Sequence, residues 1–147
     1  MIDVPLPASW LPWALLSAVF AALTAIFAKF GLEGIDADYA TLLRTFVIVA
    51  VLGALVAATG KWQSPFALPG RSVWFLVLSA LATGLSWLCY FRALKIGDAS
   101  RVAPVDKLSV VLVAVFAVVV LGERPAARDW LGIALVAGGV LLLALRR

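Results

Sequence analysis

Hydrophobic residues in this chain form five long, nearly continuous runs, and most of the prolines and charged residues lie between the runs or at their ends. The runs are Leu11–Phe30, Ala40–Thr59, Val73–Ala93, Val102–Leu121 and Trp130–Leu145. A helix that spans a bilayer needs about 17–25 apolar residues; four runs have 20 or 21 and the fifth has 16. Strands of a membrane barrel would instead alternate apolar and polar residues. The pattern predicts an all-α integral membrane protein with five transmembrane helices, whose backbone hydrogen bonds close within each segment.

The composition agrees with this class, since 65% of the residues are hydrophobic, 14% are charged and the mean hydropathy is +1.11. The connections have about nine, thirteen, eight and eight residues, too few for a soluble domain, so residues 1–147 are predicted to form one transmembrane domain. Only Asp3 is charged ahead of the first run, which is too long for a signal core and is predicted to be a retained helix.

Reactive residues are scarce. The chain has one cysteine, Cys89, and no histidine, which excludes an internal disulfide, a His-based metal site and a His-based catalytic dyad. No nucleophile elbow, phosphate loop or paired-carboxylate pattern occurs. The net charge of +4 comes from basic residues at helix ends, which favours membrane-surface contact over nucleic acid. We predict no enzymatic activity, no metal and no cofactor.

Five helices place the termini on opposite sides of the membrane: side A for the N-terminus and side B for the C-terminus. Tryptophan collects at membrane interfaces, and five of the six are expected at side A: Trp10, Trp13, Trp62, Trp74 and Trp130. Loop cations balance at four on each side, but four more lie in helices near side B: Lys29, Arg44, Arg92 and Lys107. If these count, the N-terminus is outside and the C-terminus is in the cytoplasm. If they face a cavity, insertion in both orientations is the alternative.

The odd number of helices bears on assembly. Many transporters consist of two inverted repeats with the substrate between them, yet these 147 residues contain no convincing internal repeat. A five-helix chain could reach that architecture as an antiparallel homodimer.

Asp106 is the sharpest candidate for chemistry, because ionisable residues within hydrocarbon are costly. It lies early in the fourth predicted helix, close to Ser109, and after Pro104, which a first helical turn tolerates. Lys107 can reach the interface with its long side chain. Asp106 either faces a water-filled cavity, where it binds a cation or a coupling proton, or only caps its helix.

Lys29 and Arg44 form a second candidate pair near the side-B ends of the first two helices. The connection between them holds three carboxylates, any of which could neutralise them: Glu33, Asp36 and Asp38. Asp106 is expected at a similar depth. The pair is either an interfacial salt-bridge cluster or an anion-binding or gating pair.

Two helices carry polar stripes. The third has a stripe of Ser79, Thr83, Ser86 and Tyr90, beside Trp87, and the first has a weaker one that includes Ser17 and Thr24. These hydroxyls either bond their own backbone or line a cavity wall with aromatic contacts for substrate. In the last helix, small residues that allow close helix packing predict a dimer contact: Gly132, Ala134, Gly138 and Gly139.

Three segments resemble an EamA-type domain of the drug/metabolite transporter superfamily. They are Tyr90–Ser109, with its Arg-Val-Ala-Pro-Val-Asp-Lys core, the Leu-Gly-Glu-Arg-Pro box at Leu121–Pro125, and the glycine-rich Trp130–Val140. Lys29 and Arg44 extend the resemblance over nearly the whole chain. Most members of that family are ten-helix carriers with two such domains, so the resemblance implies a single-domain, five-helix member.

The resemblance implies transport of small metabolites or drugs, usually export, by alternating access. The last helix also resembles the dimerising helix of small multidrug resistance transporters. Those proteins carry an essential carboxylate in helix one, where residues 11–28 have none, which moves attention to Asp106.

These observations together predict half of a transporter, working as a homodimer in the bacterial cytoplasmic membrane. The predicted substrate or ion pathway comprises Thr24, Lys29, Arg44, Ser86, Trp87, Tyr90, Asp106, Lys107 and Ser109. Glu123 and Arg124 are expected to stabilise the last turn. The alternative function is a non-transporting accessory subunit of another membrane complex.

Overall fold

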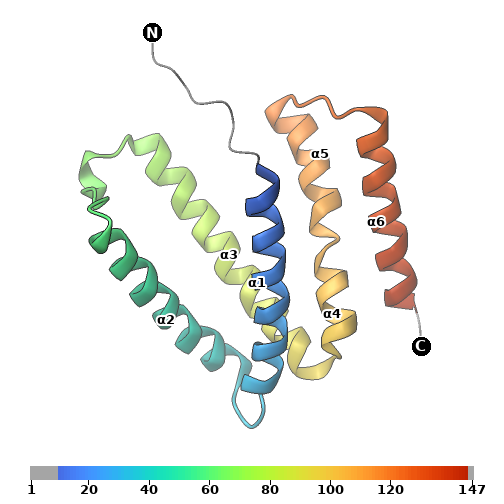
Figure 1. Cartoon of the computed structure of the whole chain (residues 1–147), viewed down its shortest axis with the longest axis horizontal. Helices are drawn as coiled ribbons and strands as arrows, with labels where there is room; N and C mark the ends of the chain where they lie inside the picture. The colour runs from blue at the N-terminus through green and yellow to red at the C-terminus, as the bar shows by residue number, and fades with distance from the viewer. Residues whose placement is uncertain (1–9, 146–147) are drawn as a thin grey trace. The chain divides into compact units, whose positions relative to one another are not determined.

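The computed structural model describes residues 10–145, and 84% of the protein is helical. Figure 1 shows the elements in order: α1 (Trp10–Gly31), α2 (Ala37–Ala58), the 3-10 turn η1 (Pro65–Ala67), α3 (Gly70–Ile96), α4 (Ala99–Asp106), α5 (Ser109–Leu121) and α6 (Ala127–Leu145). Five segments are long and apolar enough to cross a membrane, with α4 and α5 together forming the fourth, Ala99–Leu121. The predicted all-α membrane class is confirmed, and each predicted boundary lies within three residues of the observed one.

The fourth span differs from its prediction as one continuous helix. Asp98 caps α4, its carbonyl accepting from the N–H groups of Arg101 and Val102, both at 2.9 Å. The helix therefore begins at Ala99, three residues before the predicted start. Pro104 consequently lies inside α4 rather than in its first turn, so that expectation is wrong. Since proline has no N–H, α4 lacks one intrahelical hydrogen bond there.

Between α4 and α5 the helical ribbon is interrupted at Lys107 and Leu108 (Figure 1). The N–H of Lys107 donates to Pro104 O at 2.9 Å, and that of Leu108 donates to Val105 O at 3.0 Å, so each bond spans three residues instead of four. Lys107 and Leu108 keep right-handed dihedral angles, with ψ of −3° and −20°. The span is thus overwound rather than unfolded, and a short 3-10 stretch inside a helix is often a hinge.

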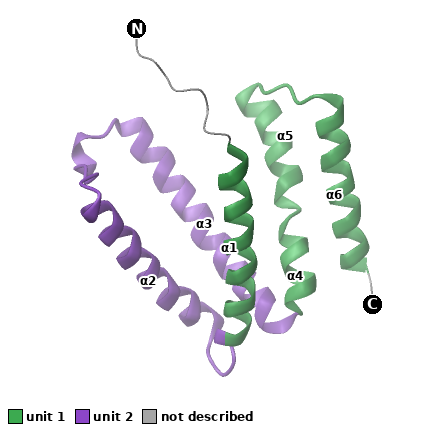
Figure 2. Cartoon of the chain, in the orientation of Figure 1, with its two compact units in different colours: residues 1–30, 98–147 green, residues 31–97 purple. Residues whose placement is uncertain are grey.

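The described chain divides into two compact units (Figure 2). Unit 1 comprises residues 1–30 and 98–147, and unit 2 comprises residues 31–97. In unit 2, α2 packs beside α3, while in unit 1, α6 packs beside α4 and α5. Unit 2 buries Phe91 and Leu94 of α3, and unit 1 buries Ala117 and Val140.

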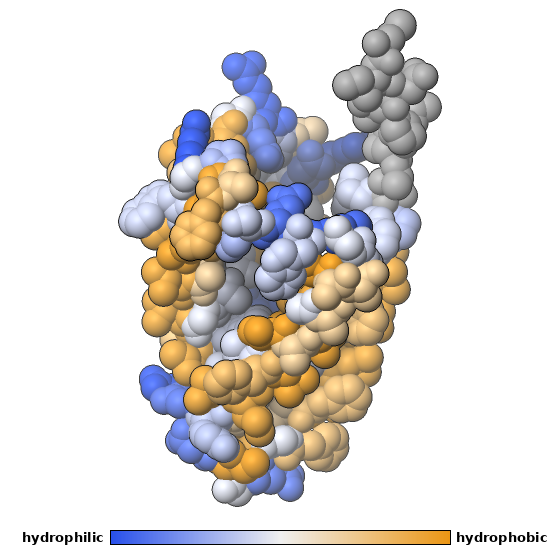
Figure 3. Space-filling model, turned by 90° about the vertical axis from the view of Figure 1, so that its left-hand side faces the viewer, coloured by the Kyte–Doolittle hydropathy of each residue, from blue (hydrophilic) through white to orange (hydrophobic). Residues whose placement is uncertain are grey.

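Most large apolar side chains within residues 10–145 are exposed. Figure 3 shows them covering the middle of the face on the α2 side, with the most hydrophilic residues toward the two ends. A soluble protein would bury such a surface, because apolar area in water is unfavourable. This surface is therefore suited to contact with the lipid bilayer.

Candidate functional site

The most distinctive charged group in unit 2 is Arg44 of α2, which lies against aromatic rings of α3. Its guanidinium carbon is 4.1 Å from the centre of the Trp87 ring and 5.0 Å from that of Phe91. Trp87 and Phe91 are four residues apart, so they share one face of α3. Arg44 is seven residues into α2, about 10 Å along its axis at about 1.5 Å per residue. The structure therefore places a cationic side chain within the second span, in contact with two aromatic rings of α3.

One polar atom of this cluster is unsatisfied. Nη1 of Arg44 is buried and has no hydrogen-bond partner in the part of the chain that the structure describes. Arg44 also belongs to none of the ion pairs identified within residues 10–145. A buried donor without an acceptor is costly, which makes this atom the clearest sign of a missing ligand.

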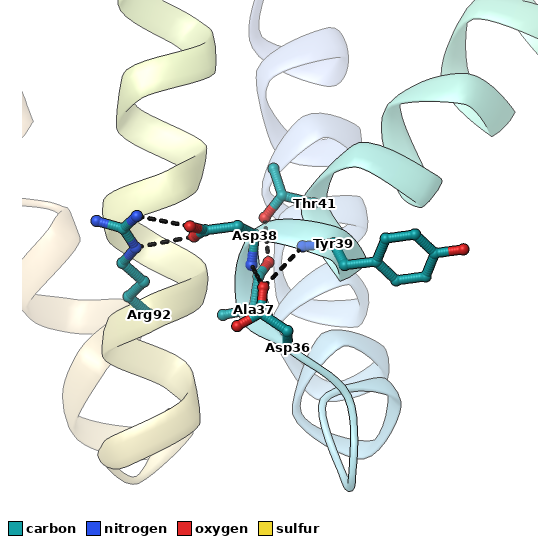
Figure 4. A network of polar contacts seen from close by, with 6 residues as sticks. All are labelled: Asp36, Ala37, Asp38, Tyr39, Thr41 and Arg92. Atoms are coloured by element: carbon teal, nitrogen blue, oxygen red, sulfur yellow. Dashed lines mark hydrogen bonds and ion pairs between the residues drawn. The ribbon is translucent and has the colours of Figure 1, made fainter.

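Two of the carboxylates that the sequence offered as partners for Lys29 and Arg44 make other contacts. Asp36 caps α2: its Oδ1 accepts from the N–H groups of Asp38 and Tyr39, at 2.9 and 3.1 Å (Figure 4). Asp38 binds Arg92 instead. An unpaired N-terminal helix end makes the first role favourable, and geometry that the sequence does not show decides the second.

The ion pair of Asp38 and Arg92 joins the start of α2 to the end of α3. Arg92 donates from Nε at 2.8 Å and from Nη2 at 2.6 Å to the two carboxylate oxygens, a two-pronged contact (Figure 4). Lys95 Nζ adds a bond of 2.5 Å to the Ile35 carbonyl at the same end. In the sequence, Arg92 is recognisable only as a helix-end cation. The two residues of the pair are 54 positions apart, and only an α2–α3 hairpin pattern could have suggested their contact.

In unit 1, the predicted ion-pathway residues flank the turn between α4 and α5. Asp106 ends α4 and Ser109 begins α5. Asp106 Oδ2 is 3.2 Å from Lys107 Nζ, and the Asp106 side chain is 36% exposed. Counted from Ala99, Asp106 lies about 10 Å into its span, deeper than a helix that began at Val102 would place it. Asp106 therefore lies at the break within this span, partly exposed and paired with its sequence neighbour.

The remaining predicted residues have mixed surroundings. The Thr83 hydroxyl donates to Ser79 O at 2.9 Å, so this part of the stripe bonds its own helix. Ser86 is exposed on α3, whereas Trp87 and Tyr90 are half-buried. Thr24 and Lys29 are half-buried on α1, in unit 1. Of the predicted pathway, the structure brings Arg44 and Trp87 into contact in unit 2, and groups Asp106, Lys107 and Ser109 in unit 1.

The small residues of α6 are all exposed: Gly132, Ala134, Gly138 and Gly139. A Cβ atom added to any of the three glycines would meet nothing within 4 Å. The face of α6 with the buried Val140 lies between two flanks, with Gly132 and Gly139 on one and Ala134 and Gly138 on the other. Both flanks can therefore accept a neighbouring helix.

A hollow of about 590 Å³ opens between α5 and α6. Apolar side chains of both helices line it, together with Glu123, Arg124 and Asp129. Asp129 Oδ2 accepts from the Ala126 N–H at 2.8 Å, and the Glu123 N–H donates to Ala117 O at 3.1 Å. These two bonds stabilise the turn through Asp129 and the backbone of Glu123.

Five apolar spans with charged groups at membrane depth define a polytopic membrane protein, and similarity to known proteins narrows the class to a membrane transporter. The profile of the EamA-like transporter family matches residues 8–145, and the chain belongs to that family. The resemblance found in the sequence is thereby confirmed. Membership of a transporter family also argues against an enzyme.

Two relatives carry transporter names. A Sinorhizobium sp protein named "Uncharacterized transporter in cobO 3'region" is 63% identical over 136 residues, covering 92% of this chain and 96% of the relative. A Bacillus subtilis (strain 168) protein named "Uncharacterized transporter YxxF" is 27% identical over 137 residues, covering 92% of this chain and 42% of the relative. No solved structure matches the chain.

Proposed function

We propose that this protein transports small metabolites or drugs, as an exporter that works by alternating access, with proton coupling through Asp106. The observation that carries the proposal is the turn inside the fourth span, because interrupted helices commonly form the ion and substrate sites of transporters. Asp106 at this turn combines an ionisable group with a local change in the hydrogen bonding of the backbone.

We further propose that two copies form one transporter. The Bacillus relative is matched over 42% of its length, so it has room for a second such domain. A homodimer would supply the same second half without covalent linkage. The exposed small residues on both flanks of α6 support close packing against a second copy.

The proposal is tested in proteoliposomes, by uptake and counterflow with a panel of metabolites under an imposed pH gradient. Asp106→Asn keeps the size of the side chain and removes its charge. The matched control is Asp98→Asn, at the other end of α4, whose side chain makes no cap hydrogen bond. We expect loss of pH-dependent flux in the first variant and normal flux in the second. Wild-type protein without flux for any solute would favour the accessory-subunit alternative.

Orientation in the bacterial cytoplasmic membrane has its own test. The loop cations are balanced, and only the four cations in helices near side B favour N-out, C-in insertion. An antiparallel dimer requires both orientations. A reporter at Arg147 and a labelled cysteine at Gln63, with Cys89 replaced by alanine, would report both sides. Dual insertion predicts signal on both; lysines at Gln63 and Ser64 should then force one orientation and lower activity. One-sided labelling with full activity would indicate a parallel dimer or an active monomer.

A further inference from the structure

The Arg44 cluster has a geometry that calls for a ligand from outside unit 2. Trp87 supports one face of the guanidinium at 4.1 Å, with Phe91 beside it at 5.0 Å. The rings attract the positive charge through their faces, and the N–H groups of the guanidinium still need hydrogen-bond acceptors. Nη1 is buried and unpaired within residues 10–145.

Two of the three carboxylates within residues 33–38 already have partners. Asp36 accepts two backbone bonds at the start of α2, and Asp38 is held by two nitrogens of Arg92. Moving either carboxylate to Arg44 would break these contacts. A cation about 10 Å inside a membrane span is costly without an anion, and an oxyanion supplied by another molecule would meet this need.

We propose that Arg44 and Trp87 form a subsite for an organic oxyanion, a carboxylate or phosphate joined to an apolar or aromatic body. The guanidinium fork matches the two oxygens of such a group, and the rings of Trp87 and Phe91 offer apolar contact beside it. The inference deepens the proposed transport function by naming the substrate class. The same oxyanion chemistry is offered by a soluble metabolite or by the phosphate of a lipid headgroup.

The test measures binding rather than transport, so the two proposals can fail separately. Calorimetric titration of the purified, delipidated protein compares benzoate and phenyl phosphate with the neutral benzamide. Wild type should bind the oxyanions and not the amide. Arg44→Gln should weaken oxyanion binding by about 10- to 100-fold, as expected for the loss of a charged hydrogen-bond donor. Arg44→Lys should lie between them, because it keeps the charge and loses the fork.

The matched control is Arg71→Gln. Arg71 lies at the other end of α3 and also faces an aromatic ring, with its guanidinium carbon 5.9 Å from the centre of Phe75, but it is exposed. This variant should bind oxyanions like wild type. Circular dichroism and gel filtration establish that each variant is folded, and Arg44→Lys remains informative if Arg44→Gln is not.

Three outcomes decide the inference. Oxyanion binding that depends on Arg44 supports it, even if no flux is measured, in which case only the transport proposal fails. Phospholipid that copurifies with wild type but not with Arg44→Gln, found by mass spectrometry, supports the same subsite with a lipid phosphate as its source. Equal binding in wild type and Arg44→Gln overturns it, as does a dimer that Arg44→Gln dissociates without any oxyanion binding, since the partner's carboxylate would then be the counterion.

Discussion

The two units of the chain hold their charged residues in different ways. In unit 2, charged side chains connect α2 to α3: Arg92 grips Asp38, Lys95 binds the Ile35 carbonyl, and Arg44 stacks on Trp87. Both helices are continuous through their spans. In unit 1, two ion pairs join sequence neighbours, Asp106 with Lys107 and Arg128 with Asp129, and the fourth span is interrupted.

This contrast suggests that unit 2 is the more rigid of the two and that the fourth span of unit 1 is the more easily bent. The contact of Arg44 with Trp87 contributes most to holding α2 against α3, because it is partly buried, whereas the exposed Asp38–Arg92 pair adds little. A neighbour-to-neighbour ion pair restrains no other helix, and a backbone that changes from four-residue to three-residue bonding bends at low cost. We therefore expect unit 2 to bind the substrate in a fixed geometry and the fourth span of unit 1 to bend during transport.

Among the substitutions considered, replacement of Asp106 in the fourth span of unit 1 should have the largest effect on transport. Asp106→Asn removes the only acidic side chain at the turn, and we expect pH-gradient-driven flux to fall by about ten-fold or more, since one proton-binding group would be lost. Detergent melting should change little, because the side chain is partly exposed and pairs only with Lys107 among described residues. Flux that stays the same at every pH would remove Asp106 from the mechanism.

The second-largest effect is expected from bulky substitutions on α6, which show which of its two flanks forms the dimer contact. Gly138→Leu and Gly139→Leu place the same side chain about 100° apart around the helix. The chain itself has room for both, so folding should survive. The variant on the dimer flank should weaken dimerisation by roughly ten-fold, the scale of small-residue packing in membranes, and crosslinking in membranes would show it. A wild-type monomer in native membranes would contradict the dimer itself.

Pro104→Ala tests whether the fourth span must bend. Alanine restores the missing N–H inside α4, and a proline in a helix interior costs about 3 kcal/mol relative to alanine. We expect a higher melting temperature in detergent and flux reduced several-fold, because a straighter span resists bending. A stabilised variant that transports normally would show that stiffness at this position is irrelevant.

The smallest effect is expected from the ion pair of unit 2. Its side chains are 46% and 63% exposed, and exposed ion pairs contribute little to stability. Asp38→Asn and Arg92→Gln should each change flux by less than about two-fold, and the double variant should equal either single one. Melting and flux measured over this double-mutant cycle give the coupling. A large, non-additive loss of flux would instead make the pair a functional gate and reverse the assignment of unit 2 as a fixed frame.

The length and spacing of apolar runs were enough to locate all five spans, because a bilayer sets both the length of a spanning helix and its need for internal backbone bonds. Sequence also identified Arg44, Trp87 and Asp106 as unusual, since each combines a polar or charged group with an apolar context. The short motifs within Tyr90–Val140 were also enough to indicate the family.

Only the tertiary structure could decide which groups meet. The pairing of Asp38 with Arg92 joins residues 54 positions apart, and the stacking of Arg44 on Trp87 likewise depends on how α2 and α3 pack. The turn at Lys107 also escaped prediction, because hydrophobic periodicity is the same in one long helix and in two collinear ones. Apolar patterning is fixed locally by the solvent that each residue faces, whereas ion pairs, stacked rings and helix breaks depend on neighbours that only the folded chain supplies.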